Sequence, residues 1–211
     1  IGLLPKKICV WLSSGRIKIK KSLLKLSTSM EQTVVLVKPD GVKKGIIGQV
    51  LSRFERVGLK LIAVKMIWVD KTFVGKHYKD DVKYHKTVGE KTLENYQKYG
   101  VDPKENLGTK DPVEIGRMVR KWNMEFLSSG PVVAMLVEGP GSVFLVRKIV
   151  GHTFPAEALP GTVRGDFALD SAFLSNLQKR TTQNIVHASG SVEEAEFERK
   201  LWFKENEIYS Y

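Results

Sequence analysis

The sequence predicts an α+β fold: a ferredoxin-like βαββαβ sandwich with a four-stranded antiparallel sheet, plus a helical/irregular insertion. Three observations lead to this prediction. Short apolar segments rich in branched side chains alternate with segments of helical periodicity, only four such strands are found, and a polar, turn-rich stretch at about residues 80–115 interrupts their order. Four strands are too few for a doubly wound sheet, so a sandwich built on one small sheet is expected.

The first part of the chain holds two predicted strands, each followed by a helix. Residues 33–37 are predicted to form a buried strand, which ends at the turn Pro39-Asp40-Gly41. Apolar residues then recur at helical spacing over residues 46–57, and Gly58 stops that helix. Branched apolar side chains over residues 59–69 predict the second strand, and a short helix is expected near residues 73–78.

The middle of the chain contains the insertion and the third strand. Residues 80–115 are expected to be irregular, with helical pieces around residues 90–99. Apolar side chains that share one face, Val119 and Trp122 among them, predict a helix over residues 113–127. A third strand is expected over residues 131–137.

The last part of the chain holds two helices and the fourth strand. A helix is expected over residues 142–150, and a Pro/Gly-rich loop over residues 152–161. Residues 184–187 are predicted to form the fourth strand. Ser191-Val192-Glu193-Glu194 has the spacing of a capping box, which predicts a helix that runs towards Trp202.

The basic residues are concentrated near the beginning of the chain. Of the net charge of +11, residues 1–29 carry +7 and contain no acidic side chain. We expect this basic leader to lie outside the folded domain, as disordered or non-native sequence, as a targeting or nucleic-acid arm, or as a native extension. Residues 30–211 then form a single domain with a net charge of only +4, so nucleic acid is not expected as its partner.

The composition excludes several classes of protein. One cysteine, Cys9, permits no internal disulfide, and with four histidines the ligand pairs of a structural zinc site are missing. No apolar run approaches the roughly 20 residues needed to cross a bilayer. We therefore expect a cytoplasmic protein without a membrane-spanning part.

A histidine ends the last predicted strand. Small residues follow His187, which lets a bulky group approach the imidazole, and a helix begins nearby. A helix N-terminus offers free N–H donors and a positive dipole end to an anion. Glu198, about two turns into that helix, reaches the ring only if the helix packs beneath it. A hydrogen-bonded histidine without a chemical role fits this segment as well.

Cationic side chains lie beside predicted turns and loops. Lys38 directly precedes a turn, Arg147 lies in the helix before the Pro/Gly-rich loop, and Arg164 opens an Arg-Gly-Asp-Phe segment. A guanidinium binds phosphate oxygens in a bidentate manner, and a lysine supplies a point charge. Thr153 and Asn184 add neutral donors. Each residue taken singly is more often a solvated surface group.

Together these segments resemble the nucleoside diphosphate kinase family. The motifs occur in the family's order and cover roughly residues 31–207. Beyond the Phe54-Glu55 helix, they are Lys38-Pro39-Asp40-Gly41-Val42, Lys76-His77-Tyr78, Ser129-Gly130-Pro131-Val132-Val133-Ala134-Met135, Pro160-Gly161-Thr162-Val163-Arg164-Gly165-Asp166-Phe167 and Asn184-Ile185-Val186-His187-Ala188-Ser189.

The resemblance implies a role for each matching residue. His187 matches the histidine that becomes phosphorylated. Ser189 and Glu198 match the pair that supports it, with Glu198 at the second ring nitrogen. The residues that match contacts to the nucleotide are Lys38, Tyr78, Arg147, Thr153 and Arg164 around the phosphates, and Asn184 at the ribose.

The chain departs from the family pattern at three places. Gly190 stands where the family usually has Asp, and His152 stands where many members have Glu. After Tyr78 the chain is longer by roughly thirty residues and lacks the aromatic residue that stacks on the base. Tyr84 is a possible substitute.

The resemblance also implies a mechanism and partners. A γ-phosphate of ATP or another NTP passes to His187 and then to an NDP or dNDP, with broad base tolerance. An imidazole of ordinary pKa is roughly three quarters neutral at pH 7, so attack needs no strong base. Mg²⁺ is expected to enter with the nucleotide, because no acidic cluster forms a dedicated cage. A homo-oligomer, a dimer-based tetramer or hexamer, is implied. The alternative is a non-catalytic nucleotide- or nucleic-acid-binding module on the same fold.

Overall fold

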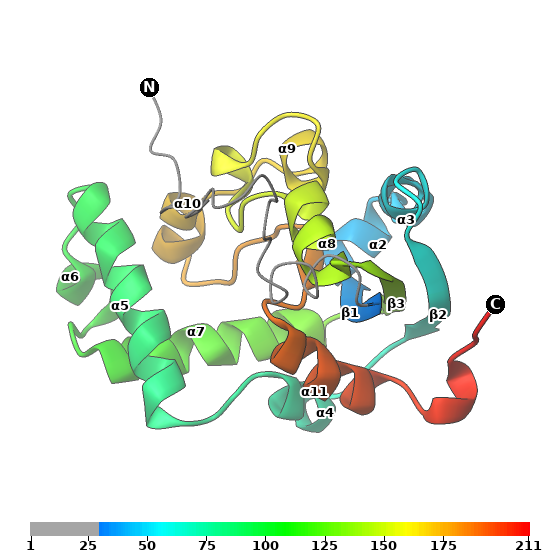
Figure 1. Ribbon diagram of the computed structural model, residues 1–211. Coiled ribbons are helices and arrows are strands. Elements are labelled where there is room, and N and C mark those ends of the chain that lie inside the picture. Colours follow the sequence, from blue (N-terminus) through cyan, green and yellow to red (C-terminus); the bar gives the residue numbers. More distant parts are fainter. Residues whose placement is uncertain (1–29) are drawn as a thin grey trace, which may run out of the picture.

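The computed structural model describes residues 30–211 (Figure 1). The basic leader, and the prediction made for it, lie outside the described residues. The strands are β1 (Met30–Val37), β2 (Lys60–Ile67), β3 (Val132–Pro140) and β4 (Val186–Ala188). They form one sheet in the order β2-β3-β1-β4, in which every neighbouring pair is antiparallel. The predicted four-stranded antiparallel sheet is therefore confirmed.

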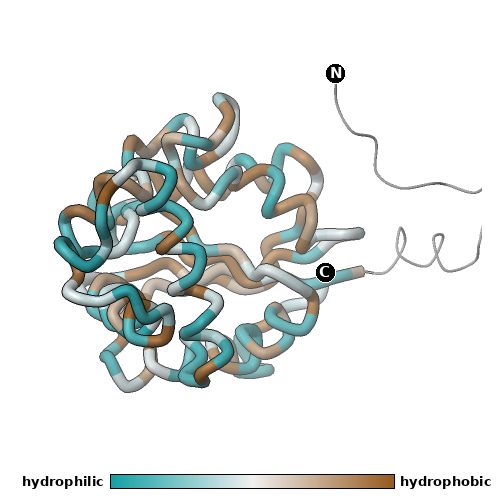
Figure 2. Tube along the Cα trace, turned by 90° about the vertical axis from the view of Figure 1, so that its left-hand side faces the viewer, coloured by the Kyte–Doolittle hydropathy of each residue, from teal (hydrophilic) through white to brown (hydrophobic). Residues whose placement is uncertain are grey.

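Helices cover both faces of the sheet because β1 and β3 are apolar on both sides. Val35 and Val37 of β1 pack towards α3 (Ile47–Glu55) and α8 (Ser142–Val150), whereas Val34 and Leu36 pack with Trp202 on the opposite face. That face is covered by α4 (Lys71–His77) and α11 (Val192–Trp202), with the end of α7 (Pro112–Leu127). Figure 2 shows the hydrophobic strands in the middle of the molecule, between helices of mixed polarity.

Residues 80–115 are more regular than expected. The helical piece predicted around residues 90–99 is confirmed, but the rest of the segment, predicted to be irregular, is largely helical as well. α5 (Val82–Lys98) and α6 (Pro103–Leu107) precede α7, and these three helices extend away from the sheet (Figure 1). Asp81, Asp102 and Asp111 each cap the start of one helix by accepting backbone N–H groups. Hydrophobic periodicity did not reveal all of these helices, because the core that they share is small and consists of Tyr96, Leu107 and Ile115.

Glycine allows α5 and α7 to approach each other closely. A Cβ added to Gly89 would lie 1.8 Å from the carbonyl oxygen of Pro112, and one added to Gly116 would lie 1.9 Å from that of His85. Both distances are far below any real contact, so the two helices require glycine where they meet.

Short helical segments connect the larger elements. They are α2 (Pro39–Lys43), the 3₁₀ turns η1 (Pro155–Glu157) and η2 (Glu205–Glu207), α9 (Val163–Phe167) and α10 (Ala172–Leu177). α10 lies beside α5 (Figure 1), where the Tyr96 hydroxyl donates to the carbonyl of Asn176 at 3.2 Å. Within residues 30–211, none of the helices is long and apolar enough to cross a membrane.

The fourth strand begins later than predicted. Asn184 and Ile185 were expected in it, but pairing with β1 starts at Val186. The reason is the backbone of Ile185, which has a φ of 70°. A β-branched residue rarely adopts this left-handed conformation, which bends the chain just before the strand.

Candidate active site

One cleft collects almost all of the residues that the sequence singled out. It has a volume of about 670 Å³ and lies where β4 and α11 face α5, α7 and α10. Ser189 does not line it but hydrogen bonds to a residue that does. The predicted site residues that line the cleft are Lys38, Tyr78, Arg147, Thr153, Arg164, Asn184, His187 and Glu198.

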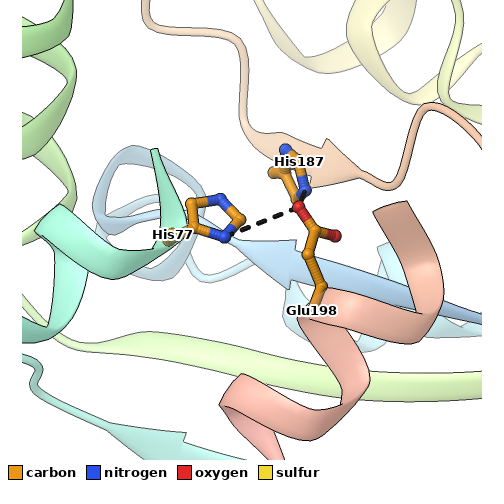
Figure 3. A group of neighbouring side chains, drawn as sticks. All are labelled: His77, His187 and Glu198. Atoms are coloured by element: carbon orange, nitrogen blue, oxygen red, sulfur yellow. Dashed lines mark hydrogen bonds and ion pairs between the residues drawn. The ribbon is translucent and has the colours of Figure 1, made fainter. Parts of the chain in front are cut away.

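His187 and Glu198 form the centre of the site (Figure 3). His187 pairs with Leu36 of β1, and α11 packs beneath the sheet so that Glu198 reaches the ring. Nε2 of His187 lies 2.7 Å from Oε1 of Glu198, and the Ser189 hydroxyl donates to Oε2 at 2.7 Å. An ionised carboxylate can only accept, so Nε2 carries the proton and Nδ1 keeps its lone pair.

His77 is a third member of this group, and sequence reasoning gave it no role. Its ring lies edge-on to His187, with the ring centroids 4.7 Å apart, and the Trp202 indole donates to its Nδ1 at 3.3 Å. Because Nδ1 accepts that bond, its 3.5 Å separation from Oε1 of Glu198 is not an ion pair. The sequence did contain a signal for this position, because His77 directly precedes Tyr78 in the motif Lys76-His77-Tyr78.

Burial keeps both histidines uncharged. The pKa of His77 falls to about 3, first because it is buried and then because of His187. Burial also lowers the pKa of His187, and Lys38 lowers it further, while Glu194 acts in the opposite direction. The side chain of His187 still has 18% of its surface exposed. An imidazole that is neutral and accessible is able to act as a nucleophile.

Lys38 and Asn184 connect the histidine strand to the start of α2. Nζ of Lys38 donates to Oδ1 of Asn184 at 2.7 Å, and Nδ2 of Asn184 donates to the carbonyl of Thr153 at 2.8 Å. Burial lowers the pKa of Lys38 to about 8; Asp40 opposes this and Arg164 adds to it. Burial therefore destabilises the charged form of Lys38, and an anion bound beside it would offset this cost.

The two arginines of the cleft are held differently. Arg164 is buried and donates to three backbone carbonyls, those of Gly151 at 2.9 Å, Val186 at 2.8 Å and Asn184 at 3.3 Å. Its pKa falls to about 10, through burial and then through Arg147. Arg147, in the last turn of α8, is exposed, and its guanidinium makes no hydrogen bond to other residues of the described chain.

Asp40 holds the strained backbone beside the site. Its two carboxylate oxygens accept the N–H of Gly41 at 3.0 Å and that of Ile185 at 2.9 Å. The carbonyl of Ile185 in turn accepts the N–H of Lys38 at 2.8 Å. These bonds compensate for the left-handed φ of Ile185, which directs Asn184 and His187 towards the same cleft.

Glu194 occupies the space next to Gly190. A Cβ added to Gly190 would lie 2.7 Å from Oε2 of Glu194 and 3.7 Å from a guanidinium nitrogen of Arg147. Burial and the neighbouring Glu198 raise the pKa of Glu194. A carboxylate one helical turn later, that of Glu194, thus occupies the space next to position 190.

The group His77, His187 and Glu198 has ligand atoms within 4.8 Å of one another, but it does not suit magnesium. Mg²⁺ prefers oxygen ligands, and both oxygens of Glu198 already accept hydrogen bonds. Two further carboxylates line the cleft, those of Glu193 and Glu194, and Glu194 lies beside Gly190 and Arg147.

Two aromatic side chains of the insertion and of α7 also line the cleft. Tyr84 lines the cleft, as does Trp122, which sequence reasoning placed on the core face of its helix. Trp122 does pack against the small core of α5 to α7, so periodicity alone did not distinguish a core position from a cleft position.

Positive charge that converges on an uncharged imidazole is suited to holding phosphoryl groups, so the fold and the cleft define an α+β phosphotransferase. A family model described as Nucleoside diphosphate kinase matches residues 31–93 and 115–208. The chain therefore belongs to the nucleoside diphosphate kinase family, whose members move the γ-phosphate of an NTP to an NDP.

Relatives and solved structures agree with this assignment. The chain is 41% identical over 179 residues to the nucleoside diphosphate kinase of Pyrobaculum aerophilum, covering 85% of this chain and 98% of that protein. Identity to the enzyme of Borreliella burgdorferi is 38% over 185 residues, covering 86% and 92%. A crystal structure of an NDP kinase from Pyrobaculum aerophilum superposes with a TM-score of 0.84 at 40% identity, covering 86% and 100%.

A second structure bears on the chemistry. It is a transition state mimic of nucleoside-diphosphate kinase from Borrelia burgdorferi with bound vanadate and ADP, and it has a TM-score of 0.68 at 37% identity, covering 86% of this chain and 92% of that one. This chain is accordingly an enzyme, a nucleotide-binding phosphotransferase. Residues 94–114, which the family model leaves unmatched, fall within the segment predicted as an insertion.

Proposed function

We propose that His187 is the nucleophile of a ping-pong reaction. Nδ1 attacks the γ-phosphorus of an NTP, the bond to the bridging oxygen breaks, and the NDP leaves; a second NDP or dNDP then takes the phosphoryl group from the histidine. The observation that supports this role is the 2.7 Å contact between Nε2 and Glu198, because it leaves the lone pair of Nδ1 for the cleft. Glu198 also stabilises the positive charge that develops on the ring.

Cations of the chain neutralise the transferred group. Phosphoryl transfer requires in-line positioning and stabilisation of charge on the equatorial oxygens. Arg147, unpaired among the described residues, is free to bind phosphate, while Arg164 and Lys38 supply buried charge. Tyr78 and Thr153 supply neutral hydrogen-bond donors at the same cleft.

Magnesium is proposed to enter with the nucleotide. It would reduce the negative charge of the phosphate oxygens, and Glu194 is the side chain that would help to hold it. Asn184 is proposed to contact the ribose. Because these contacts involve phosphate and sugar, the enzyme accepts all common bases to some extent, with ATP and other NTPs as donors.

We also propose a homo-oligomer, with a dimer as its basis. β2 is an edge strand that pairs only with β3 in the described chain. Val64, Met66 and Trp68 are 54%, 59% and 67% exposed and form an apolar row beside this edge. The backbone of an uncovered edge strand is able to pair with a second copy of the chain. A monomer at micromolar concentration in sedimentation would contradict the proposal. A cytoplasmic location is proposed on the family resemblance, and cell fractionation tests it.

The decisive experiment mixes the purified protein with Mg²⁺ and γ-labelled ATP in the absence of an acceptor. We expect acid-labile label on the wild type and none on His187→Ala, and we expect GDP or dCDP to discharge it. A folded wild-type protein that takes up no label would refute the nucleophile. It would instead favour the non-catalytic binding module, which the cations gathered around a neutral His187 argue against.

A further inference from the structure

Three segments build the outer end of the cleft, away from His187. α5 contributes Asn95, α7 contributes Trp122 and Asn123, and the segment that includes α10 contributes Asn176 and Thr181. Asn95 lies in the stretch that the family model does not match. Figure 1 shows α5, α7 and α10 together on the side of the molecule away from β2.

These three segments are tied to one another, so the wall is a built surface. The Thr181 hydroxyl donates to Oδ1 of Asn123. α10 is fixed to α5 by the bond from Tyr96 and by the contact of Tyr99 with Phe173, whose ring centroids are 4.8 Å apart. Side chains on this wall are therefore held in place before any ligand arrives.

The wall leaves amide groups without partners in the described chain. Nδ2 of Asn95 donates to the carbonyl of Lys91 at 2.8 Å, and since that carbonyl can only accept, Oδ1 of Asn95 remains as a free acceptor. Asn123 accepts from Thr181 and keeps its Nδ2 as a free donor. The side chain of Asn176 makes no hydrogen bond to other described residues. A free acceptor and a free donor thus face one cleft.

The position of His187 fixes how a nucleotide enters this cleft. With the phosphates at His187 and the cations, and the sugar next to Asn184, the base points towards the outer end. The edge of the base furthest from the sugar then meets the wall. In adenine this edge carries N1, an acceptor, beside the 6-amino group, a donor. Guanine carries the reverse pattern, and in a pyrimidine the corresponding edge ends one ring closer to the sugar.

We propose that Asn95 and Asn123 are specificity-determining residues that read the N1–C6 edge of adenine, with Trp122 as an aromatic surface for the base, so that adenine nucleotides are preferred within a broad activity. Oδ1 of Asn95 accepts from the 6-amino group, and Nδ2 of Asn123 donates to N1. This inference rests on the proposed function for the orientation of the nucleotide.

Calorimetry with ADP, CDP and purine riboside 5′-diphosphate tests the proposal. The last ligand is a purine that lacks a C6 substituent. One neutral hydrogen bond contributes about 1 kcal/mol, so we expect the wild type to bind ADP about fivefold to tenfold more tightly than purine riboside diphosphate or CDP. Asn95→Leu, of similar volume, should bind ADP only as tightly as purine riboside diphosphate and should leave CDP unchanged. Gln97→Leu, an exposed amide on the same helix, is the matched control.

Equal affinity of the wild type for ADP and purine riboside diphosphate would overturn the proposal, as would a loss in Asn95→Leu that is the same for all three ligands. Calorimetry requires no chemistry. A defect in base reading is therefore distinguishable from a failure of the phosphohistidine mechanism, which the labelling of His187 measures separately.

Discussion

Glu198 contacts His187 at Nε2, which leaves Nδ1, the nitrogen proposed to attack, on the other side of the ring. Its Oε1 lies 2.7 Å from Nε2, while its Oε2 accepts the Ser189 hydroxyl, whose oxygen in turn accepts the N–H of Val34 in β1 at 3.2 Å. The carboxylate is 1% exposed. The orientation of the His187 ring is thus fixed by a chain of hydrogen bonds anchored in the sheet, so that little reorganisation is needed in the proposed reaction.

Replacing Glu198 by Gln should lower turnover without weakening nucleotide binding. An amide does not stabilise the positive ring as a carboxylate does, and orienting partners of this kind are worth about 10- to 100-fold. We expect kcat to fall by that factor while the KM for ATP stays within about twofold, because Glu198 does not face the phosphates. Glu196→Gln, exposed on the same helix, should behave as the wild type. Unchanged kcat in the Glu198 variant would contradict the role.

The rate of phosphorylation should persist at a lower pH than the pKa of an ordinary histidine would allow. Burial lowers the pKa of His187, so the ring stays neutral where an unperturbed imidazole, with a pKa of about 6.5, would be about three quarters protonated at pH 6. Single-turnover phosphorylation by ATP should therefore change little between pH 7 and pH 6. A rate that halves at pH 6.5 would show that burial does not govern this group.

The strands and the site motifs were predictable because their signals are local. β1 and β3 are continuous apolar runs, and the residues around His187 stand in short motifs. The left-handed φ of Ile185 was not predictable, because only the contacts with Asp40 and Lys38 stabilise it. An apolar strand pattern carries no information about such a bend.

The sequence did not predict all the helices of residues 80–115 or the place of Trp122 in the cleft, and the reason is a different one. α5 packs on α7 through glycine and buries few apolar side chains, so its periodicity is weak. Its one clear signal was the capping Asp81. Trp122 has the spacing of a core residue and also lines the cleft, and only the position of α10 opposite to it distinguishes these two environments.

The alkaline limb of the pH profile of kcat/KM should reflect the loss of the charge on Lys38. Its pKa is lowered to about 8, so it is charged below pH 8 and loses its charge as the pH rises through that value. We expect kcat/KM for ATP to fall as the pH rises through 8. Lys38→Arg should keep its charge to much higher pH, since an arginine pKa exceeds about 12, and should move this limb upward even if its rate is lower. Lys43→Arg, an exposed neighbour, should leave the limb in place. An unmoved limb in Lys38→Arg would assign it to another group.

Alanine at the two arginines should separate catalysis from stability. Each guanidinium contributes on the order of 3 kcal/mol to the transition state, by comparison with oxyanion donors, so both variants should lose about a hundredfold or more in kcat. Only Arg164→Ala also leaves three buried or partly buried carbonyls without their donor. Its Tm should fall by several degrees in calorimetry, whereas that of Arg147→Ala should be unchanged. Full turnover in Arg164→Ala would refute its role at the phosphates.

Restoring the carboxylate that the family usually carries at position 190 should harm this enzyme. The end of the Glu194 side chain occupies that space and is able to move, so a methyl group in Gly190→Ala should cost little. Gly190→Asp instead places a second carboxylate against Glu194 at the phosphate end of the cleft. Like charges at this distance raise the pKa of one of them and repel the nucleotide. We expect the KM for ATP to rise several-fold in Gly190→Asp, less so at high salt, because salt screens the repulsion.

The double variant decides whether charge or space is responsible. Gly190→Asp with Glu194→Gln keeps the crowding and returns the local charge to that of the wild type. If repulsion is the cause, its KM should recover to within about twofold of the wild-type value. If the double variant stays as weak as Gly190→Asp alone, the loss arises from displacement of the loop between β4 and α11, and Glu194 does not replace the missing aspartate.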